Sequence, residues 1–225
     1  LSADPSIAAV AADGTVTGSG AHKTLWTPDE SFSSTKTNNL KIKVEASEQA
    51  GPSGAKYLVI DLSGGPEAAA YPVSYLETEP EGGWTEEYKT TKMVLKLIGP
   101  GTFTMGSPEG ELGKSYDETA HEVTLTKSFF AGVFEVTQKQ YELVTGTTPS
   151  LFQGDARPVE RVSYDMIRGA IEGGKWPSSN SVDEDSFLGI LRSKTNLAFD
   201  LPTEAQWEYA CRAETTTALN AGSDL

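Results

Sequence analysis

Sulfur and imidazole are scarce in this chain of 225 residues, which contains one cysteine, Cys211, and two histidines, His22 and His121. A disulfide within the chain needs two cysteines and a thiolate metal cage needs at least two sulfurs, so both are excluded. A Ser-His-Asp triad would have to use one of the two histidines, and neither has the spacing of a metal ligand. His121 opens the alternating segment HEVTLT, and we interpret it as a residue at the edge of a strand.

Positive charge and long apolar runs are scarce as well. The 18 lysines and arginines face 32 aspartates and glutamates, which gives a formal net charge of −14. Such an acidic chain repels phosphate backbones and anionic lipid surfaces, so nucleic acid is not expected as a partner. No apolar run reaches the roughly 18 residues that a bilayer-spanning helix requires, so we expect no membrane span.

The first part of the chain predicts a tail followed by strands. Residues 1–13 are small and aperiodic, which is typical of a terminal tail. KIKVEA at 41–46 alternates, which places Ile42 and Val44 on one face and the lysines on the other, and KYLVIDL at 56–62 is a fuller apolar run closed by glycines and a proline. We therefore interpret residues 14–76 as a small all-β module.

An acidic stretch follows at residues 77–90, where five glutamates accompany Pro80 and a Gly82-Gly83 pair. Segments of this composition resist packing. We interpret it as a solvated linker between domains in preference to a cation site, with Trp84 able to pin it to one of the domains.

From residue 91 onward, strands are interspersed with short helices. Apolar patterns indicate strands at 93–99, 102–106 and 121–137. Helix starts are indicated by capping signals, in which a side chain accepts a hydrogen bond from an unpaired backbone donor. The capping boxes are Thr137 with Gln140, Ser181 with Glu184, and Thr203 with Gln206, and Ser163 is a plain N-cap. Strands and helices without strict βαβ alternation favour the α+β class.

The helix that follows Leu201 is the most informative segment. Glu208 and Arg212 stand four residues apart in the favourable order, which is worth about 0.2–0.5 kcal/mol in an isolated helix. Trp207 and Cys211 are also four apart and share one face of the helix. We expect both of them to be buried, with the small sulfur packed beside the indole.

The string LPTEAQWEYACRA at 201–213 resembles the signature of the formylglycine-generating enzyme, or sulfatase-modifying factor, family. Three upstream segments occur in the family's order: GTFTMGS at 101–107, ETAHEVTLTKSFFAGVFEVTQKQYELV at 118–144, and RPVERVSYDMIRGA at 157–170. The resemblance covers residues 91–225, with Asp200 in place of the arginine usual before the signature and Glu214 in place of a glycine after it. The signature residues, to which we assign a structural role, are Leu201, Pro202, Thr203, Glu204, Trp207, Glu208, Tyr209 and Arg212.

The resemblance implies a loop-rich variant of the C-type lectin fold for residues 91–225. The known activity of the family is a copper-dependent oxidation of a sulfatase cysteine to formylglycine. It relies on a cysteine pair in a C-terminal part of the family domain that does not occur in this chain, so the domain is truncated relative to the family. Cys211 stands at neither position of that pair, and copper is implied only if the missing half is present. We therefore assign no catalytic, cofactor-binding or metal-binding residue in this chain.

Two main hypotheses follow for a secreted or cell-envelope protein. In the first, the chain is a non-catalytic scaffold that binds a protein or glycan ligand, since one scaffold can serve both enzymes and binding proteins. In the alternative, it is part of a copper-dependent formylglycine-generating oxidase that acts on a protein cysteine, with the catalytic half missing from this chain. A plainly truncated gene product would instead expose core surface and aggregate.

Overall fold

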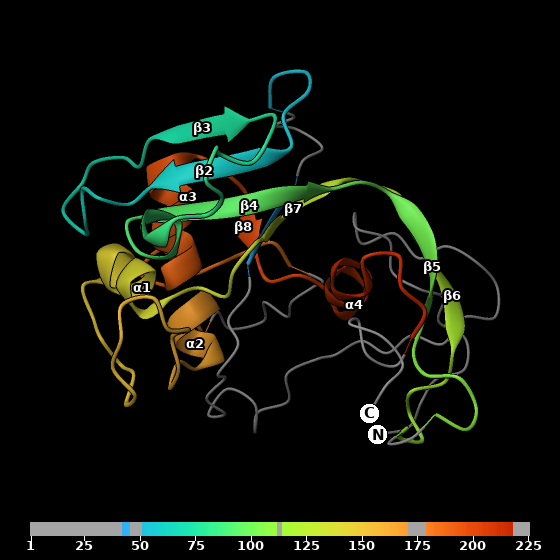
Figure 1. The fold of residues 1–225 in the computed structure, drawn as a ribbon. Helices are drawn as coiled ribbons and strands as arrows, with labels where there is room; N and C mark the ends of the chain where they lie inside the picture. Colours follow the sequence, from blue (N-terminus) through green and yellow to red (C-terminus); the bar gives the residue numbers. More distant parts are fainter. Residues whose placement is uncertain (1–41, 46–50, 112–113, 171–178, 218–225) are drawn as a thin grey trace. The chain divides into compact units, whose positions relative to one another are not determined.

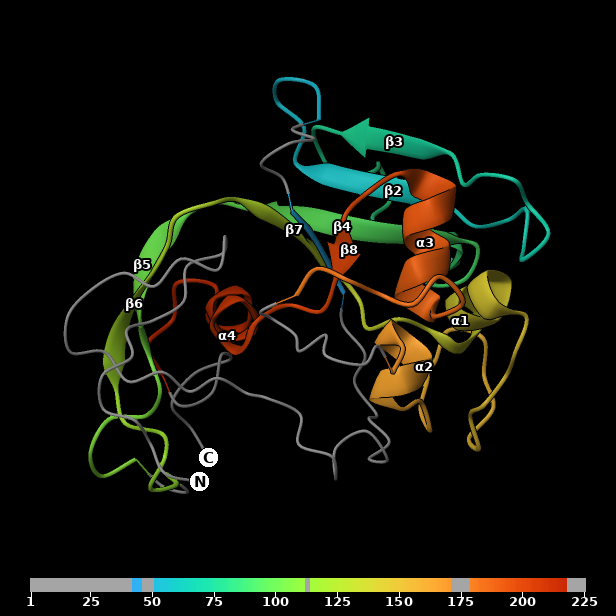
Figure 2. The ribbon, with the colours of Figure 1, turned by 180° about the vertical axis from the view of Figure 1, so that it is seen from behind.

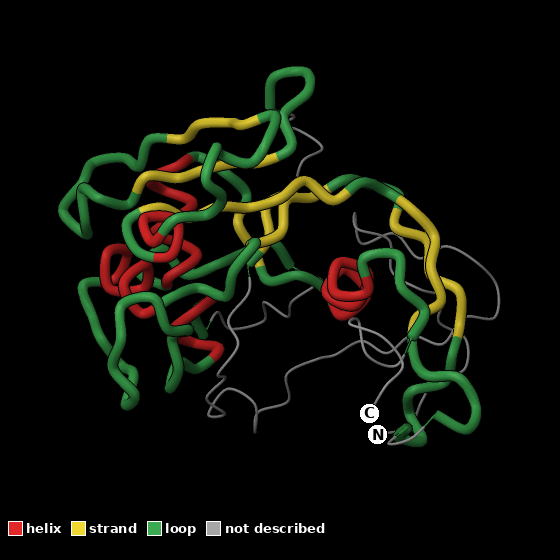
Figure 3. The backbone as a smooth tube through the Cα atoms, viewed as in Figure 1, coloured by secondary structure: helices red, strands yellow, loops and turns green. Residues whose placement is uncertain are grey.

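The computed structural model describes residues 42–45, 51–111, 114–170 and 179–217. These residues combine helices with antiparallel sheets, as the α+β class requires (Figure 1). Short elements are joined by long loops (Figure 3). The described residues fall into two compact units, which we call the sheet unit (within 42–98 and 129–201) and the hairpin unit (within 99–128 and 202–217).

The sheet unit is built on a six-stranded antiparallel sheet. Along strand β2, Leu58 and Ile60 point to one face and Tyr57 and Val59 to the other, and all four are buried. β2 is therefore covered on both faces, as the continuous apolar run of its sequence indicates. In sheet order the strands are β3 (Val73–Leu76), β2 (Tyr57–Asp61), β4 (Lys92–Ile98), β7 (Phe129–Gly132), β1 (Lys43–Glu45) and β8 (Phe199–Asp200).

Three helices cover one face of this sheet (Figure 2). The Tyr141 ring of helix α1 stacks on the Phe187 ring of helix α3, with ring centroids 5.2 Å apart, at the centre of the main hydrophobic core. The helices are α1 (Gln138–Thr145), α2 (Tyr164–Arg168) and α3 (Phe187–Thr195).

The capping signals place two of these helix starts correctly. The box of Thr137 and Gln140 opens α1, and Ser163 caps α2. The predicted box of Ser181 and Glu184 is wrong, because α3 begins after Ser186, whose hydroxyl accepts a hydrogen bond from the Gly189 backbone nitrogen. A serine five residues further along thus takes the role of the cap.

Part of the acidic stretch at 77–90 packs on the sheet through Trp84, the residue that we expected to pin the stretch to one domain. The Trp84 ring lies edge-on to Tyr57 and to Tyr88, with ring centroids 5.0 Å apart in each case. The Tyr57 hydroxyl donates to Glu79 at 2.9 Å. The aromatic side chains supply apolar area on the face opposite the main helices, and the glutamates remain at its margin.

Strands from both sides of this stretch share one sheet. β2 pairs with β4 over five residues, so the strands assigned to a separate β module do not form a sheet of their own. β1 lies between β7 and β8. Lys43, which the alternating pattern places on the face opposite Ile42, is buried there as well, because an interior strand is covered on both faces. The predicted tail, residues 1–13, lies outside the described residues.

The hairpin unit consists of a two-stranded antiparallel sheet and one helix. Strand β5 (Gly101–Met105) pairs with β6 (His121–Leu125), and helix α4 (Glu204–Arg212) is opened by the predicted capping box of Thr203 and Gln206. His121 begins β6, as predicted. Among the helices of the described residues, none combines the length and apolar character needed to cross a bilayer.

A buried ion-pair network lies where α2, α3 and β8 meet in the sheet unit. Arg168 donates from Nε and Nη2 to the two Asp200 carboxylate oxygens, at 2.8 and 3.0 Å, and Arg192 adds a longer contact of 3.3 Å. Arg168 and Asp200 are both buried. Asp200 is therefore the anion that neutralises buried arginine charge.

We expect Asp200→Asn to destabilise the protein by about 3–5 kcal/mol, because it leaves the Arg168 charge buried without a counter-ion. Urea unfolding followed by circular dichroism measures the change. The control is Glu142→Gln, which breaks a partly exposed pair with Lys139 in the same unit and should cost less than about 1 kcal/mol. Equal effects of the two substitutions would show that Asp200 is not the counter-ion on which the buried Arg168 depends.

Candidate functional site

An ion pair on helix α4 binds the backbone of one glycine of the hairpin and so fixes the helix to it. Glu208 accepts a hydrogen bond from the Gly106 nitrogen at 2.8 Å and another from Arg212 Nε at 2.7 Å, and Arg212 Nη2 donates to the Gly106 carbonyl at 2.8 Å. Gly106 has a φ of +89°, and a Cβ there would lie 2.8 Å from the Thr119 carbonyl oxygen, so only glycine fits. The predicted Glu208–Arg212 pair is thus present, and both of its members also bind the hairpin backbone.

Tyr209 adds an aromatic contact on the same side of α4. Its ring lies 5.1 Å from the Phe103 ring of β5, centroid to centroid. A Cβ at Gly101 would lie 2.2 Å from the Tyr209 hydroxyl, so the Tyr209 side chain lies directly against the backbone of the hairpin at this glycine. The side of α4 that carries Glu208, Tyr209 and Arg212 therefore faces the hairpin.

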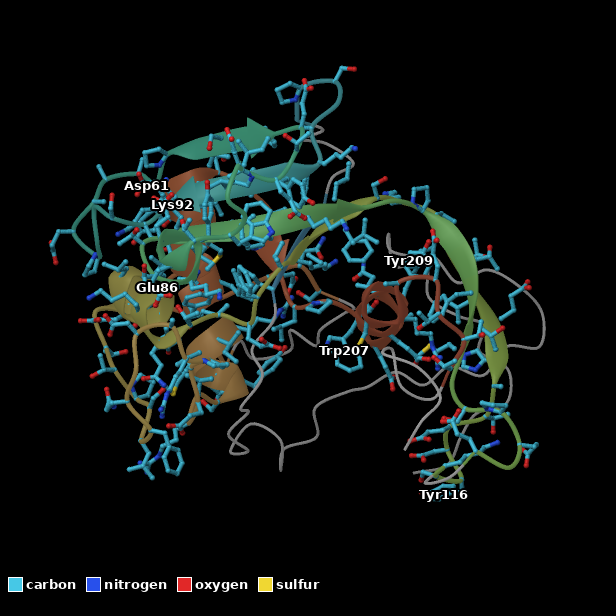
Figure 4. The ribbon with its side chains drawn as sticks, viewed as in Figure 1. Asp61, Glu86, Lys92, Tyr116, Trp207 and Tyr209 are labelled. Atoms are coloured by element: carbon cyan, nitrogen blue, oxygen red, sulfur yellow. The ribbon has the colours of Figure 1, made fainter. Side chains whose placement is uncertain are left out.

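Trp207 and Cys211 are exposed, which contradicts the expectation that they are buried. The exposed fraction of Trp207 is 50%, and Cys211 is also exposed. Figure 4 shows Trp207 and Tyr209 on different sides of α4. The spacing correctly predicts that Trp207 and Cys211 share a face, but the ion pair and Tyr209 decide that the opposite face is the one that packs.

The exposed side of α4 also carries negative charge. Desolvation raises the pKa of Glu204, the carboxylates of Glu208 and Asp117 raise it further, and His121 opposes them. Glu204 and Asp117 are both exposed, and within the described residues no lysine or arginine forms an ion pair with either. The carboxylates of Glu204, Glu208 and Asp117 therefore act on one another at the first turn of α4, and His121 partly offsets them.

Gln206 holds a donor without an acceptor in the first turn of α4. This residue is fully buried, and its Oε1 accepts from the Thr203 nitrogen at 3.0 Å as part of the capping box. Its Nε2 is the one buried side-chain polar atom in the described part of the chain that has no hydrogen-bond partner. An unsatisfied buried donor costs about 1–3 kcal/mol.

The remaining signature residues lie in the segment that leads into α4. Thr203 is the N-cap, Pro202 precedes it and is half-buried, and Leu201 packs against the main core of the sheet unit. The signature therefore divides into residues that anchor α4 and residues, Glu204 and Trp207, that remain at the surface.

A second surface feature lies in the sheet unit, on the loop after α1, and we did not predict it. Leu151 and Phe152 are 61% and 67% exposed. The carboxylate of Glu160 accepts from the Phe152 nitrogen at 3.0 Å and also from the Leu151 nitrogen. Gln138 donates to the Phe152 carbonyl at 2.9 Å and accepts from the Gly154 nitrogen at 3.1 Å. These hydrogen bonds hold the loop backbone in place while two apolar side chains face solvent.

One signal in the sequence could have indicated this loop. Two large apolar residues stand together between Pro149 and Gly154, where turn residues predict a surface segment. The residues that fix the loop, Gln138 and Glu160, are distant in sequence and carry no pattern that points to it.

The residues of this chain do not fit the copper that the family resemblance implies. Copper(I) favours thiolate ligands, and the chain has one cysteine, which lies at the surface of α4. In the part of the chain that the structure describes, no group of three or more His, Cys, Asp or Glu side chains is arranged to hold a metal ion. We derive no reaction step through copper.

A comparison with known protein families matches more than half of the chain. Residues 83–221 match the family model of the sulfatase-modifying factor enzyme 1-like domain, which begins inside the acidic stretch. The chain is 37% identical over 105 residues to the Chaperone protein LppX of Paenibacillus barcinonensis. That match covers 39% of this chain and 37% of the length of the relative. No solved structure matches the chain significantly.

We expect Glu208→Ala to cost about 1–3 kcal/mol, because the Gly106 nitrogen and Arg212 both lose their acceptor. Chemical denaturation measures the loss. Glu204→Ala, on the exposed side of the same helix, is the matched control and should have a clearly smaller effect. A neutral Glu208→Ala would show that the ion pair does not hold α4 to the hairpin.

The raised pKa of Glu204 predicts a pH dependence of stability. Because the pKa of Glu204 is higher in the folded state, protonation of this group stabilises the fold. That stabilisation is fully present below the unfolded-state pKa of 4.5 and is lost as pH rises through the folded-state pKa. Relative to Glu204→Gln, the wild-type melting temperature should therefore fall across this window. A difference that is constant with pH, or that grows in favour of the wild type, would contradict the prediction.

Proposed function

The chain belongs to the family of the sulfatase-modifying factor enzyme 1-like domain, and from this membership we propose that it is a non-catalytic scaffold of the family that binds a protein partner. The loop-rich, C-type-lectin-like form of the fold is part of this proposal. It is supported by the short helices and antiparallel strands joined by long loops (Figure 3).

The observation that carries the proposal is the exposed pair Leu151 and Phe152. Large apolar side chains on a loop whose backbone is already fixed can contact a partner with little loss of conformational entropy. Gln138 and Glu160 bind backbone groups of Phe152 and Gly154. What the loop offers to a ligand is therefore apolar contact area, which is typical of protein-binding surfaces.

The name of the matched relative supports a protein ligand over a glycan. That relative is named a chaperone, and exposed apolar side chains suit the apolar segments of a non-native protein. The net charge of −14 keeps copies of the chain apart while such surfaces are exposed. A secreted or cell-envelope location remains part of the proposal.

The second candidate function is a part of a copper-dependent formylglycine-generating oxidase that acts on a protein cysteine. The family match over residues 83–221 favours it. The cysteine pair that the activity requires would have to come from residues other than those of this chain, because Cys211 is single. Oxygen consumption with copper and a cysteine-containing peptide would support this second function and contradict the first.

The proposed function is tested with heat-denatured citrate synthase, whose aggregation is followed by light scattering. We expect the wild type to suppress scattering and Phe152→Ser to reduce the suppression at least about twofold, because apolar contact area is lost. The control is Tyr116→Ser, which changes a 92%-exposed aromatic residue in the hairpin unit and should behave as the wild type.

Two outcomes contradict this proposal. If Phe152→Ser suppresses aggregation as well as the wild type, the loop is not the binding surface. If the chain is retained on immobilised glycans and does not suppress aggregation, the ligand is a glycan and the protein partner is wrong.

A further inference from the structure

We propose that the Leu151–Phe152 loop binds polypeptide segments in which an acidic side chain lies next to an apolar one, and that Arg157 and Arg161 select the acidic side chain. This inference rests on the proposed function and deepens it, because it names the charge of the ligand that the loop accepts. The loop lies between α1 and α2 (Figure 1). Its apolar pair supplies contact area, and charge complementarity decides among ligands that are equally apolar.

Two arginines beside this loop are not used by the fold. Three of the five arginines of the chain form ion pairs with Asp200 or Glu208. The other two, Arg157 and Arg161, are exposed, and among the residues that the structure describes neither of them forms an ion pair. A guanidinium group presents a planar fork of donors that binds a carboxylate through two hydrogen bonds. Both groups are therefore available to a carboxylate of a ligand.

Arg157 lies against the backbone of the loop. A Cβ placed on Gly154 would lie 2.8 Å from Arg157 Cδ and 3.0 Å from its Cγ, and the Arg157 nitrogen donates to the Gly154 carbonyl at 2.9 Å. Gly154 stands two residues after Phe152, and the side chain of Gln138 binds the backbone of both. The Arg157 side chain is therefore held beside the segment that carries the apolar pair.

Arg161 is held next to Leu151 through its neighbour Glu160. The Ser150 hydroxyl accepts from the Glu160 nitrogen at 3.0 Å and donates to the Glu160 carbonyl at 3.3 Å, and the Glu160 carboxylate accepts from the Leu151 nitrogen. Arg161 has a φ of +63°, a left-handed conformation that glycine and asparagine adopt more readily than arginine. The Ser150 contacts on one side and the buried Val162 on the other fix this conformation. The backbone thus presents Arg161 at a fixed position beside the apolar pair.

The carboxylates of the same region interact with other groups. Glu160 accepts from two backbone nitrogens of the loop. The hydrogen bond to Glu142 raises the pKa of Lys139 against desolvation, and the charges of Glu142 and Asp155 raise it further, so Asp155 acts on this lysine. Asp165 lies in the first turn of α2, where backbone N–H groups favour negative charge. An acidic ligand is therefore favoured at the two arginines, although the chain has a net charge of −14.

The experiment measures the fluorescence anisotropy of two labelled peptides added to the full chain at about 0.15 M salt. In one peptide, leucine-glutamate pairs alternate with glycine-serine spacers, and in the other, lysine replaces glutamate. An exposed ion pair changes a binding constant by up to about fivefold, so with two arginines we expect the glutamate peptide to bind about five- to tenfold more tightly. The net charge of the chain alone would favour the lysine peptide, so the order of the two affinities decides between the explanations.

A double variant, Arg157→Gln with Arg161→Gly, removes both charges and keeps the shape of the loop. Glutamine retains the Cγ and Cδ atoms that lie on Gly154, and glycine adopts a positive φ without strain. We expect this variant to lose the preference for the glutamate peptide. The control, Lys56→Gln with Lys96→Gln, changes the net charge equally at two exposed residues elsewhere in the sheet unit and should keep the preference. Thermal melting followed by circular dichroism checks that both double variants are folded.

Equal binding of the two peptides, a preference for lysine, or no binding of either overturns the inference, as does a preference that survives in the arginine double variant. Phe152→Ser separates this inference from the proposed function. If Phe152→Ser weakens both peptides while the arginine double variant keeps the preference, the loop binds protein and only the selection by charge is wrong. If Phe152→Ser leaves both affinities unchanged, the loop is not the binding surface, and the proposed function fails together with the inference.

Discussion

The sheet unit depends on the neutralisation of two arginines by Asp200. Arg168 lies at the end of α2, Arg192 lies in α3, and Asp200 ends β8, so one carboxylate ties two helices to the last strand of the sheet. Arg168 Nη2 also donates to the Ser179 carbonyl at 2.6 Å, which fixes the chain on its way into α3. Burying these charges is unfavourable unless each is paired.

One side of helix α4 is bound to the hairpin, and the other side is exposed. Glu208 accepts from the backbone nitrogen of Gly106, Arg212 donates to its carbonyl, and Tyr209 packs on Phe103. Because these contacts lie on one side, the other side carries Trp207 and Glu204 at the surface of the protein. The residues of the family signature thus hold the helix and, at the same time, present its outer face.

Local features of the fold could be predicted from the sequence, and long-range features could not. The boxes at Thr137 and Thr203 and the apolar strand β2 follow from patterns of three to seven residues. The burial of Lys43 and the packing of Trp84 depend on which strand becomes a neighbour, and no local pattern encodes that. The exposure of Trp207 has the same origin, since periodicity shows which residues share a face but not what covers it. Leu151 and Phe152 could have been noted, but their rigidity depends on the distant residues Gln138 and Glu160.

The outer strand β3 has a consequence for how copies of this chain meet one another. It has only four residues and begins directly after Pro72, which has no backbone N–H to offer. Short edges next to proline give an incoming strand few main-chain groups with which to extend the ladder. Strand addition by another copy of the chain is therefore discouraged at this edge of the sheet, while apolar side chains are exposed elsewhere on the protein.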